Sequence, residues 1–515
     1  MYTIGDIPRK SAQLFPNHEA TVFEDVRLTY RELNDRVNRF ANALTKMGYQ
    51  KGERLAILAE NTHKYLEVYF AAAKLGMSVT PLNFRLSDSE IEHIVINSES
   101  VCLLAADGYE ARAWGLKDSL PGIKDWITLD NPAEGYHFYE DLLKSASAQE
   151  PEVAVDEDEM AILMYTGGTT GLPKGVMISH RNIMTSLIAQ NLGLGFNKTD
   201  TTCLILPLFH LAFWPAMCLL MIGGKAVIHR KPDLNEILRL IQDEKCTHIN
   251  AVPTIYMWIL QNTDVDAYDL SSLRSISYAG SPFPPEMLKQ CIMKFGNIFF
   301  QGYGMTEALG ATGLEPEDHV LEGDKSRLLA SAGRPALCAE VRVVDENSRP
   351  VETGRIGEVA IKGKHVMMGY WKNPELTAKT IRNGWYHSGD MGYMDEEGYL
   401  FLADRKADMI VTGGENVYPK ETEDVLYEHP AVAMATVVSA PDEKWGERVQ
   451  AAVVLKPNRT VDEKELIDHC KARLAGYKCP KAVAFFDELP TSPLGKILRK
   501  DVKKKFWKNF ERSIG

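Results

Sequence analysis

The sequence lacks the paired-cysteine patterns of a disulfide framework or a zinc site. Its cysteines are scattered and none forms a C-x-x-C pair, which is typical of reduced thiols in a cytosolic protein. The start, from Met1 to Asp6, has no basic segment followed by an apolar core. The most apolar stretch, Leu211–Gly224, is shorter than the roughly 20 residues that a membrane-spanning helix needs. We therefore expect a soluble, cytoplasmic chain without stable membrane insertion.

An excess of positive charge is also missing. Lys and Arg number 58 against 70 Asp and Glu, which gives a net charge of −12. A surface of that sign disfavours nucleic acid and anionic membranes as partners. An anionic substrate must therefore be met by local donors rather than by the overall field.

What is present predicts an α/β protein of more than one domain. The 515 residues exceed the length at which one hydrophobic core keeps growing. Short apolar strands alternate with helical segments, one of which begins at the capping box Thr29-Tyr-Arg-Glu32, and this rhythm is typical of helix-covered, mostly parallel sheets. Strand-rich sequence follows from about residue 340 to 403. We expect a large N-terminal domain over residues 1–403, a hinge at 404–407 and a small α+β C-terminal domain over 408–515.

The strongest local signal is a loop rich in glycine and threonine. It runs Tyr165-Thr-Gly-Gly-Thr-Thr-Gly-Leu-Pro-Lys-Gly175, directly after the apolar strand Ala161–Met164. Glycines let a backbone approach a ligand, successive N–H groups form an anion-binding nest, and Lys174 adds a cation, so the loop suits a polyphosphate. It is not the ordinary P-loop, because Pro173 stands where a glycine should precede the lysine. A flexible Gly/Thr turn is the alternative interpretation.

Four more segments follow this loop along the chain: Gln301-Gly-Tyr-Gly-Met-Thr-Glu307, Gly384-Trp-Tyr-His-Ser-Gly-Asp390, Asp404-Arg-Lys-Ala-Asp-Met-Ile410 with Gly413-Gly-Glu-Asn-Val-Tyr-Pro419, and Pro490-Thr-Ser-Pro-Leu-Gly-Lys496. Together they resemble the adenylate-forming superfamily, which includes AMP-forming acyl-CoA synthetases for fatty or aryl acids, peptide-synthetase adenylation domains and firefly luciferase. The resemblance covers about residues 28 to 500, and it implies that the small C-terminal domain is a mobile lid.

The resemblance implies a nucleotide site. Tyr303 would stack on adenine, Asp390 would accept hydrogen bonds from two ribose hydroxyls, and Arg405 would bind ribose or phosphate oxygens. Out of context, a core aromatic, a turn residue and a surface ion pair are the alternatives for these three. The expected ATP- and AMP-binding residues are Thr166, Gly167, Gly168, Thr169, Thr170, Lys174, Gly280, Ser281, Pro282, Gln301, Gly302, Tyr303, Thr306, Asp390, Arg405 and Lys496.

Catalysis is expected to depend on charge at the α-phosphate. Lys496 would stand between the substrate carboxylate and that phosphate, which relieves the repulsion between two anions. A solvated lysine in a basic stretch is the alternative. Glu307 offers a hard oxygen ligand for Mg²⁺, with Thr166 as a second ligand, and Thr306 would donate to the α-phosphate. The expected catalytic residues are Lys496, His210, Thr306, Glu307 and Lys174.

An acyl pocket is expected around His210, in the segment Pro207-Leu-Phe-His210. The resemblance implies that this histidine lies at the pocket mouth, whereas a hydrogen-bonded, half-buried histidine is the alternative. Bulky and small apolar neighbours suggest a medium-chain, alicyclic or aromatic acid, although some of them must be plain core. The expected wall residues are Leu211, Ala212, Phe213, Trp214, Ala216, Tyr278, Ala279 and Gly304.

A swinging lid would then present a second face to coenzyme A. The resemblance places the hinge at Ala407 and the coenzyme A contacts at Gly413, Gly414 and Trp445, with plain packing as the alternative for the tryptophan. Two positions depart from the family pattern: Gly167 replaces a common serine or threonine, and Ala407 replaces Asp or Lys. Alanine still permits the backbone rotation of a hinge.

The expected reaction is therefore ligation of a carboxylic acid to coenzyme A, with ATP as co-substrate and Mg²⁺ as cofactor. The chain stops at Gly515 without a carrier-protein segment, which favours coenzyme A over a peptide-synthetase role. A stand-alone adenylation enzyme that loads a separate carrier protein is the main alternative, followed by light-producing oxidation and a nucleotide-binding regulator. We expect no nucleic-acid partner, and a monomer or a homodimer.

Overall fold

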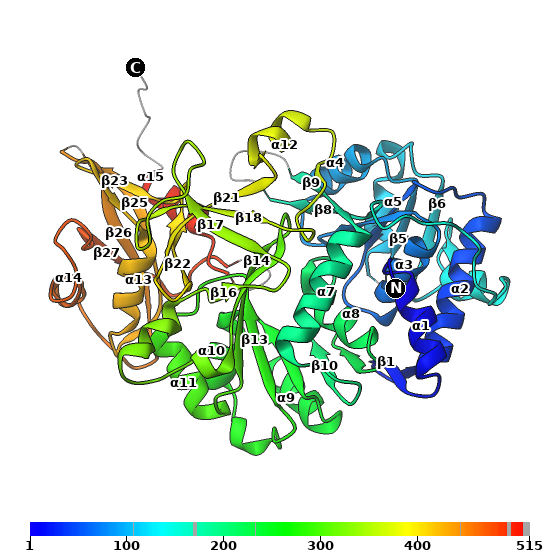
Figure 1. Ribbon diagram of the computed structural model, residues 1–515, viewed down its shortest axis with the longest axis horizontal. Coiled ribbons are helices and arrows are strands. Elements are labelled where there is room, and N and C mark those ends of the chain that lie inside the picture. The colour runs from blue at the N-terminus through cyan, green and yellow to red at the C-terminus, as the bar shows by residue number, and fades with distance from the viewer. Residues whose placement is uncertain (107, 168–172, 232, 443, 492–495, 508–515) are drawn as a thin grey trace.

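The fold is described from a computed structural model that covers residues 1–515 except 107, 168–172, 232, 443, 492–495 and 508–515, with only the backbone of Leu211. Figure 1 shows two large sheets surrounded by helices, a strand-rich part beside them, and a C-terminal part at the opposite end from the N-terminus. The predicted α/β class is confirmed.

The first large sheet has eight strands in the order β19-β9-β8-β4-β3-β5-β6-β7. Its strands are parallel from β8 to β7, and β9 and β19 add to the β8 edge in antiparallel fashion. The bounds are β3 (Arg54–Leu58), β4 (Ser78–Leu82), β5 (Cys102–Ala105), β6 (Asp125–Thr128), β7 (His137–Phe138), β8 (Met160–Thr166), β9 (Lys174–Ser179) and β19 (Gly369–Tyr370).

The second large sheet has nine strands in the order β16-β15-β14-β13-β12-β10-β11-β1-β2. The strands from β14 to β1 are parallel, and β2, β15 and β16 are antiparallel additions. The bounds are β1 (Glu19–Phe23), β2 (Val26–Thr29), β10 (Thr201–Leu204), β11 (Lys225–Ile228), β12 (His248–Ala251), β13 (Ser275–Ala279), β14 (Phe299–Met305), β15 (Leu309–Leu314) and β16 (Arg334–Pro335).

Helices pack around these two sheets (Figure 1). The predicted capping box starts α2: Thr29 Oγ1 accepts from the Glu32 N–H, and the Glu32 carboxylate accepts from the Thr29 N–H. The apolar stretch that is too short for a membrane contains the buried helix α8. The helices are α1 (Asp6–Leu14), α2 (Tyr30–Lys46), α3 (His63–Lys74), α4 (Asp88–Ser98), α5 (Glu110–Gly115), α6 (Tyr139–Lys144), α7 (His180–Leu194), α8 (Trp214–Leu220), α9 (Leu234–Asp243), α10 (Pro253–Asn262) and α11 (Pro285–Phe295).

A strand-rich part and a small C-terminal part complete the chain. The first holds a five-stranded antiparallel sheet and α12 (Pro374–Thr380); its strands are β17 (Glu340–Val344), β18 (Gly357–Lys362), β20 (Ile381–Arg382), β21 (Trp385–Met394) and β22 (Leu400–Arg405). The second holds β23 (Ile410–Thr412), β24 (Glu415–Val417), β25 (Val432–Asp442), β26 (Gly446–Leu455) and β27 (Ala482–Phe485), with α13 (Pro419–Tyr427), α14 (Glu463–Lys471) and α15 (Arg499–Trp507).

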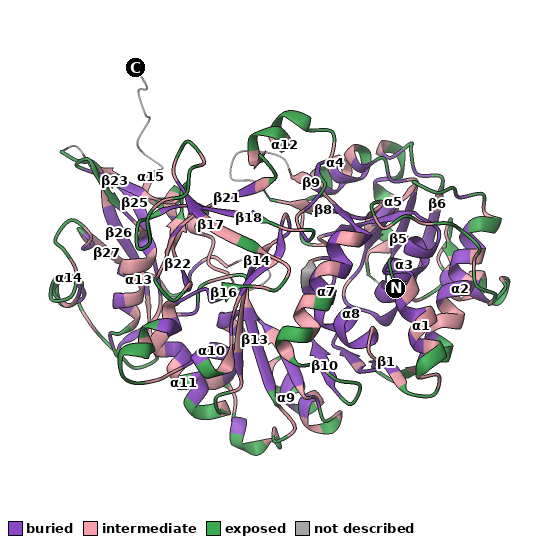
Figure 2. Cartoon of the chain, viewed as in Figure 1, coloured by how far each residue is buried: buried purple, intermediate pink, exposed green. Residues whose placement is uncertain are grey.

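Burial follows this division. The central strands of both large sheets are mostly buried, and the C-terminal part has a hydrophobic cluster of its own around Ile410, Val437 and Leu466 (Figure 2). A core that belongs to the C-terminal part alone is what a separately moving unit requires. Among the described residues, no helix combines the length and the apolar character needed to cross a bilayer.

Candidate active site

The ends of adjacent strands place the expected nucleotide residues together. In the second sheet β13 pairs with β14, so that Ala279 lies opposite Gly302. The turn at Gly280, with φ of +84°, therefore runs beside Tyr303. Ser281 is half-buried and Pro282 is exposed in the same turn. Ligands of parallel α/β sheets bind at the carboxyl ends of strands, which is where these residues lie.

The glycine–threonine loop joins β8 to β9 in the first sheet. Thr166, the last residue of β8, lies opposite Lys174, the first residue of β9. Gly167 is exposed. The expected contacts at Gly168, Thr169 and Thr170 lie outside the described residues. The structure therefore describes only the two ends of this loop.

Asp390 is the centre of the expected ribose site. It lies on β21, and β22 pairs with that strand so that Arg405 is its direct partner. Arg405 Nε lies 3.4 Å from Asp390 Oδ1, and the Tyr303 hydroxyl donates to Asp390 Oδ2 at 2.8 Å. Three segments that are far apart in sequence therefore meet at one carboxylate. Burial raises the pKa of Asp390, although Arg405, Tyr303 and Lys496 act in the opposite direction.

Lys496 reaches this cluster from the C-terminal part. Its side chain is half-buried close to Asp390 and Arg405, while the glycine before it lies outside the described residues. Burial, together with the charges of Arg405 and Arg499, lowers the pKa of Lys496 to about 8. An ammonium in this position is set to interact with anions bound beside Asp390.

Glu307 follows β14 and is the expected magnesium ligand. Burial raises the pKa of this carboxyl group, and the Tyr370 hydroxyl donates to its Oε1 at 3.0 Å. Thr306, beside it, is buried. Sequence reasoning missed Tyr370; the short strand β19 that carries it is recognisable only through its pairing with β9.

The donor set at Glu307 fits Mg²⁺ bound together with nucleotide. Among the described residues there is no group of three or more His, Cys, Asp or Glu that could hold a metal ion. Mg²⁺ commonly binds through one or two protein oxygens and completes its octahedron with water and substrate phosphates. A single buried carboxylate, with Thr166 at the end of β8 as the second expected ligand, suits that arrangement.

His210 ends a turn in which its N–H donates to the carbonyl of Pro207 at 3.1 Å. The ring is half-buried, and burial lowers the pKa of His210 to about 4, so the imidazole is neutral at physiological pH. A neutral imidazole can donate or accept a hydrogen bond but does not supply a cation. The contribution of His210 therefore depends on the orientation of its ring.

The expected acyl wall contains residues with different surroundings. Phe213 packs on Tyr69 with 4.9 Å between ring centroids, and the Tyr278 hydroxyl lies 3.1 Å from His319 Nε2. Ala212, Trp214 and Ala216 are buried, Ala279 is half-buried, and the side chain of Leu211 lies outside the described residues.

Gly304 has a backbone reason to be glycine. A Cβ there would lie 1.6 Å from the carbonyl oxygen of Leu309, at the irregular register between β14 and β15. The residue is thus required by the close approach of two backbones. Its lack of a side chain is not by itself a sign of space for a substrate.

The expected coenzyme A residues meet on one surface of the C-terminal part. The Gly413 N–H donates to the carbonyl of Trp445 at 3.1 Å, and a Cβ on Gly413 would lie 2.6 Å from the indole ring. Gly413 and Gly414 both have positive φ, +59° and +86°. Trp445 leaves 46% of its surface exposed. This arrangement offers an open aromatic face beside a glycine turn.

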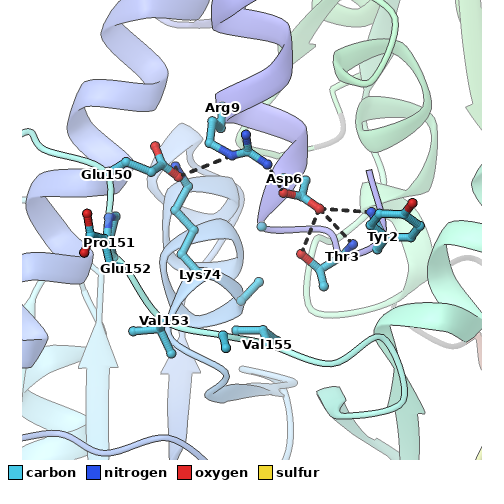
Figure 3. A pocket seen from close by; sticks show the side chains of 13 residues that line it. Tyr2, Thr3, Asp6, Arg9, Lys74, Glu150, Pro151, Glu152, Val153 and Val155 are labelled. Atoms are coloured by element: carbon cyan, nitrogen blue, oxygen red, sulfur yellow. Dashed lines mark hydrogen bonds and ion pairs between the residues drawn. The ribbon is translucent and has the colours of Figure 1, made fainter.

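The linings of two cavities do not include Tyr303, Asp390 or Lys496. One of about 400 Å³ is lined by α1, the end of α3 and the segment 150–155 (Figure 3). There Lys74 Nζ donates to Glu150 at 2.6 Å, and Asp6 accepts from Arg9 and from the Tyr2 N–H. Arg9 Nε also lies 3.8 Å from Glu150 Oε1, which links the N-terminal helix to the segment 150–155. The other cavity, of about 220 Å³, lies beside Ala407, between the hinge and α15.

Comparisons with known proteins identify the family. The chain matches the family described as "AMP-binding enzyme" over residues 8–371 and "AMP-binding enzyme C-terminal domain" over residues 421–496. It is 36% identical to a feruloyl-CoA synthase of an Amycolatopsis species, over 98% of this chain and 99% of that one. It is 35% identical to the long-chain-fatty-acid–CoA ligase FadD13 of Mycobacterium tuberculosis, with the same coverage. The solved amide bond synthetase McbA of Marinactinospora thermotolerans superposes with a TM-score of 0.89 at 28% identity, over 98% of this chain and 100% of that one.

Proposed function

Because the chain belongs to the AMP-binding enzyme family, we propose that it is an AMP-forming ligase that joins a carboxylic acid to coenzyme A. In the first step a carboxylate oxygen attacks the α-phosphorus of ATP, and the bond to the β-phosphate oxygen breaks to release pyrophosphate. In the second step the coenzyme A thiolate attacks the acyl carbon, and AMP leaves with the electrons of the broken C–O bond. The thiol proton passes to solvent.

One observation carries this proposal: a half-buried lysine from the C-terminal part lies near enough to Asp390 in the large part for their charges to interact. The two residues are more than a hundred positions apart in sequence. Nothing in simple nucleotide storage requires a lid to bring a cation to the ribose site. Activation of a carboxylate does require it, because two anions must come together.

The remaining groups have distinct roles in the first step. Asp390 and Arg405 hold the ribose, and the ring of Tyr303 stacks on adenine while its hydroxyl fixes Asp390. Mg²⁺, when bound with ATP, neutralises phosphate charge. Glu307 supplies its protein carboxylate ligand, and Tyr370 orients that carboxylate.

The acid is proposed to be aromatic, alicyclic or of medium chain length. The aromatic side chains Phe209, Phe213 and Trp214 next to His210 support this class, as does similarity to a feruloyl-CoA synthase. Because the chain is also similar to a long-chain-fatty-acid–CoA ligase, acids with acyl chains of different length must be compared. An acceptor other than coenzyme A is the second candidate, favoured by the structural likeness to an amide bond synthetase.

The test is carboxylate-dependent pyrophosphate release, measured with and without coenzyme A. Acetate, octanoate, benzoate, ferulate and palmitate form the panel of acids, and coenzyme A, an amine and a carrier protein form the panel of acceptors. We expect benzoate, ferulate or octanoate to give the highest kcat/KM and only coenzyme A to be consumed. Pyrophosphate release with no acid-dependent component contradicts the adenylation step, and product formed only with an amine or a carrier protein contradicts the choice of acceptor.

The lid orientation is proposed to be held by a contact across the hinge. Asp404, the first residue of the expected hinge, accepts from Arg499 of α15 at 2.5 Å and from the Lys420 N–H at 3.1 Å. Lys420 lies in the first turn of α13, and the residue before that helix supplies no side-chain cap. Asp404 therefore caps a lid helix from the other side of the hinge, a favourable place for a carboxylate. Rotation about Ala407 would break both contacts.

We expect Asp404→Asn to slow adenylate formation about tenfold, because one charged hydrogen bond contributes about 1.5 kcal/mol to the orientation it stabilises. Thioester synthesis from supplied acyl-adenylate should be unchanged or faster. Asp424→Asn is the control, since Asp424 pairs with Lys420 within α13. Equal slowing of both half-reactions in single-turnover assays would instead indicate general damage to the lid.

We expect Trp445→Ala to raise the KM for coenzyme A about tenfold, because stacking of a base on an aromatic ring contributes about 1–3 kcal/mol. Adenylation, measured without coenzyme A, should not change. Tyr477→Ala is the matched control, because Tyr477 is another exposed aromatic of the same part with a lysine near its ring. If Trp445→Ala lowers the melting temperature but leaves this KM unchanged, the ring serves only to pack on Gly413.

A further inference from the structure

Asn61 is a buried polar residue that lies outside every segment expected to carry chemistry. It stands between β3 and α3 and is only 3% exposed. Its carboxamide nitrogen donates to the carbonyls of Leu206 at 3.0 Å and His229 at 2.9 Å. Its oxygen accepts from the N–H of Leu208 at 2.8 Å. Both donors and one acceptor site of the amide are therefore committed to the backbone.

The three partners belong to the segment that ends at His210 and to its neighbour. Leu206 and Leu208 flank Pro207, and the His210 N–H closes the turn on the carbonyl of Pro207. His229 follows β11 and donates its own N–H to the carbonyl of Leu204, the last residue of β10. Asn61 thus holds the backbone on both sides of Pro207, at the start of the turn, and fastens it to the adjacent strand end.

These hydrogen bonds cross from one large sheet to the other. Asn61 follows β3 of the eight-stranded sheet, which also contains β8 and β9 and so carries both ends of the glycine–threonine loop. The turn with His210 follows β10 of the nine-stranded sheet. The carboxamide therefore links the sheet that carries both ends of the glycine–threonine loop to the sheet that carries the turn with His210.

Two other contacts along the turn are weaker than the hydrogen bonds of Asn61. The Tyr69 hydroxyl lies 3.4 Å from the carbonyl oxygen of Leu208, and Phe209 meets Phe84 edge to face at 5.4 Å between centroids. Neither contact reaches the backbone on both sides of Pro207. The next residue, Thr62, caps α3.

We propose that Asn61 is a positioning residue for the first chemical step: through the 206–208 backbone it holds the ring of His210 against the reacting carboxylate. The inference rests on the proposed function. A neutral imidazole contributes only through hydrogen bonds, so its effect depends on placement. Reacting groups displaced by about 1 Å can cost roughly 100-fold in rate.

The test is a double-mutant cycle on carboxylate-dependent pyrophosphate release, with kcat and the KM values for acid and ATP measured separately. We expect Asn61→Ala and His210→Ala each to lower kcat about 10- to 100-fold with little change in the KM for ATP. The double variant should be no slower than His210→Ala alone, because a residue that acts through His210 has nothing left to position. Asn61→Asp keeps the acceptor for the Leu208 N–H but turns a carboxylate oxygen toward the two carbonyl oxygens, so it should lower kcat at least as much as Asn61→Ala.

Asn38→Ala is the control for loss of a buried asparagine. Asn38 lies in α2 and is 2% exposed. Its amide oxygen accepts from Lys74 Nζ, and its amide nitrogen donates to the carbonyl of Ala148. It should lower the melting temperature without changing kcat. Melting curves of all variants separate unfolding from loss of position, and Asn61→Asp supplies a near-isosteric variant should Asn61→Ala fail to fold.

Three results would overturn the inference. Multiplicative effects of the two substitutions would show that Asn61 acts independently of His210. A wild-type kcat in Asn61→Ala or Asn61→Asp would show that the turn holds itself. A wild-type kcat in His210→Ala would remove the residue through which Asn61 is said to act. By contrast, wild-type enzyme that releases no pyrophosphate with any acid contradicts the proposed function itself.

Discussion

Lys496→Ala is expected to lower the rate of adenylate formation about 1000-fold, while thioester synthesis from supplied acyl-adenylate stays within a few-fold of the wild type. The loss follows from removal of the cation that lies near Asp390 and that would meet the carboxylate and the α-phosphate. Removal of a single preorganised group that stabilises transition-state charge costs about 100- to 1000-fold in known enzymes. The second half-reaction forms no bond to phosphorus and releases no pyrophosphate, so it does not need this ammonium at the α-phosphate.

The measurement is single-turnover formation of acyl-adenylate, followed by a separate assay of thioester formation from synthetic acyl-adenylate and coenzyme A. Lys504→Ala is the control, because Lys504 lies on α15 in an exposed ion pair with Asp501 and should not affect either half-reaction. If Lys496→Ala forms adenylate at the wild-type rate, the role assigned to this lysine is wrong. If both half-reactions fall equally, the substitution has disturbed the lid.

The same lysine predicts a pH dependence. Burial lowers the pKa of Lys496 to about 8, and the charged form, present below that pKa, is the active one. The kcat/KM for ATP in adenylation should therefore fall as pH rises above about 8, by up to tenfold for each pH unit. Lys496→Arg keeps its charge at these pH values and should abolish this decline, whatever its absolute rate.

Local patterns predicted the elements because the forces that form them are local. The capping box at Thr29 and Glu32 involves residues three positions apart, and the structure contains it. The glycine–threonine loop could be proposed as a phosphate nest from sequence because such a nest is built from consecutive residues. Most expected residues of the nucleotide site also lie on or beside neighbouring strands, so the pairing of β13 with β14 brings Gly280 beside Tyr303, and the pairing of β21 with β22 brings Asp390 beside Arg405.

Residues that act through long-range contacts escaped sequence reasoning. Asn61 bonds partners that lie about 145 and 168 positions further along the chain, and Tyr370 bonds Glu307 from 63 positions away. A lone asparagine after a strand resembles any turn residue, and nothing near it indicates a partner. Gly304 shows the reverse problem: the sequence suggested space for a substrate, whereas its position is dictated by the backbone of Leu309.

Asp390→Asn is expected to raise the KM for ATP about 50-fold and at the same time to raise the melting temperature of the nucleotide-free protein. The first effect follows because the ribose hydroxyls lose a charged acceptor, and each such hydrogen bond contributes about 1.5–3 kcal/mol. The second follows from the raised pKa of Asp390, whose main cause is burial. A carboxyl group with a raised pKa in the folded state favours folding most below its unfolded pKa, and that contribution is lost as pH rises through the folded pKa.

At neutral pH, therefore, the ionised Asp390 destabilises the empty protein, and a neutral amide of the same shape removes the cost. Asp395→Asn is the matched control with the opposite sign. Burial alone would raise the pKa of Asp395, but hydrogen bonds from Arg327 and from the Tyr399 N–H lower it overall. Its contribution to stability is present at neutral pH and is lost as pH falls through the folded pKa.

Asp395→Asn should thus lower the melting temperature at pH 7 and leave the KM for ATP unchanged. Asp390→Asn should instead raise both the melting temperature and the KM for ATP. Thermal unfolding between pH 4 and pH 8 and initial rates at varied ATP measure the two effects on the same preparations. A carboxylate retained at a cost to stability is retained for what it binds. If Asp390→Asn destabilises the nucleotide-free protein and leaves the KM for ATP unchanged, Asp390 only fastens Tyr303 to Arg405, and the ribose must be held elsewhere.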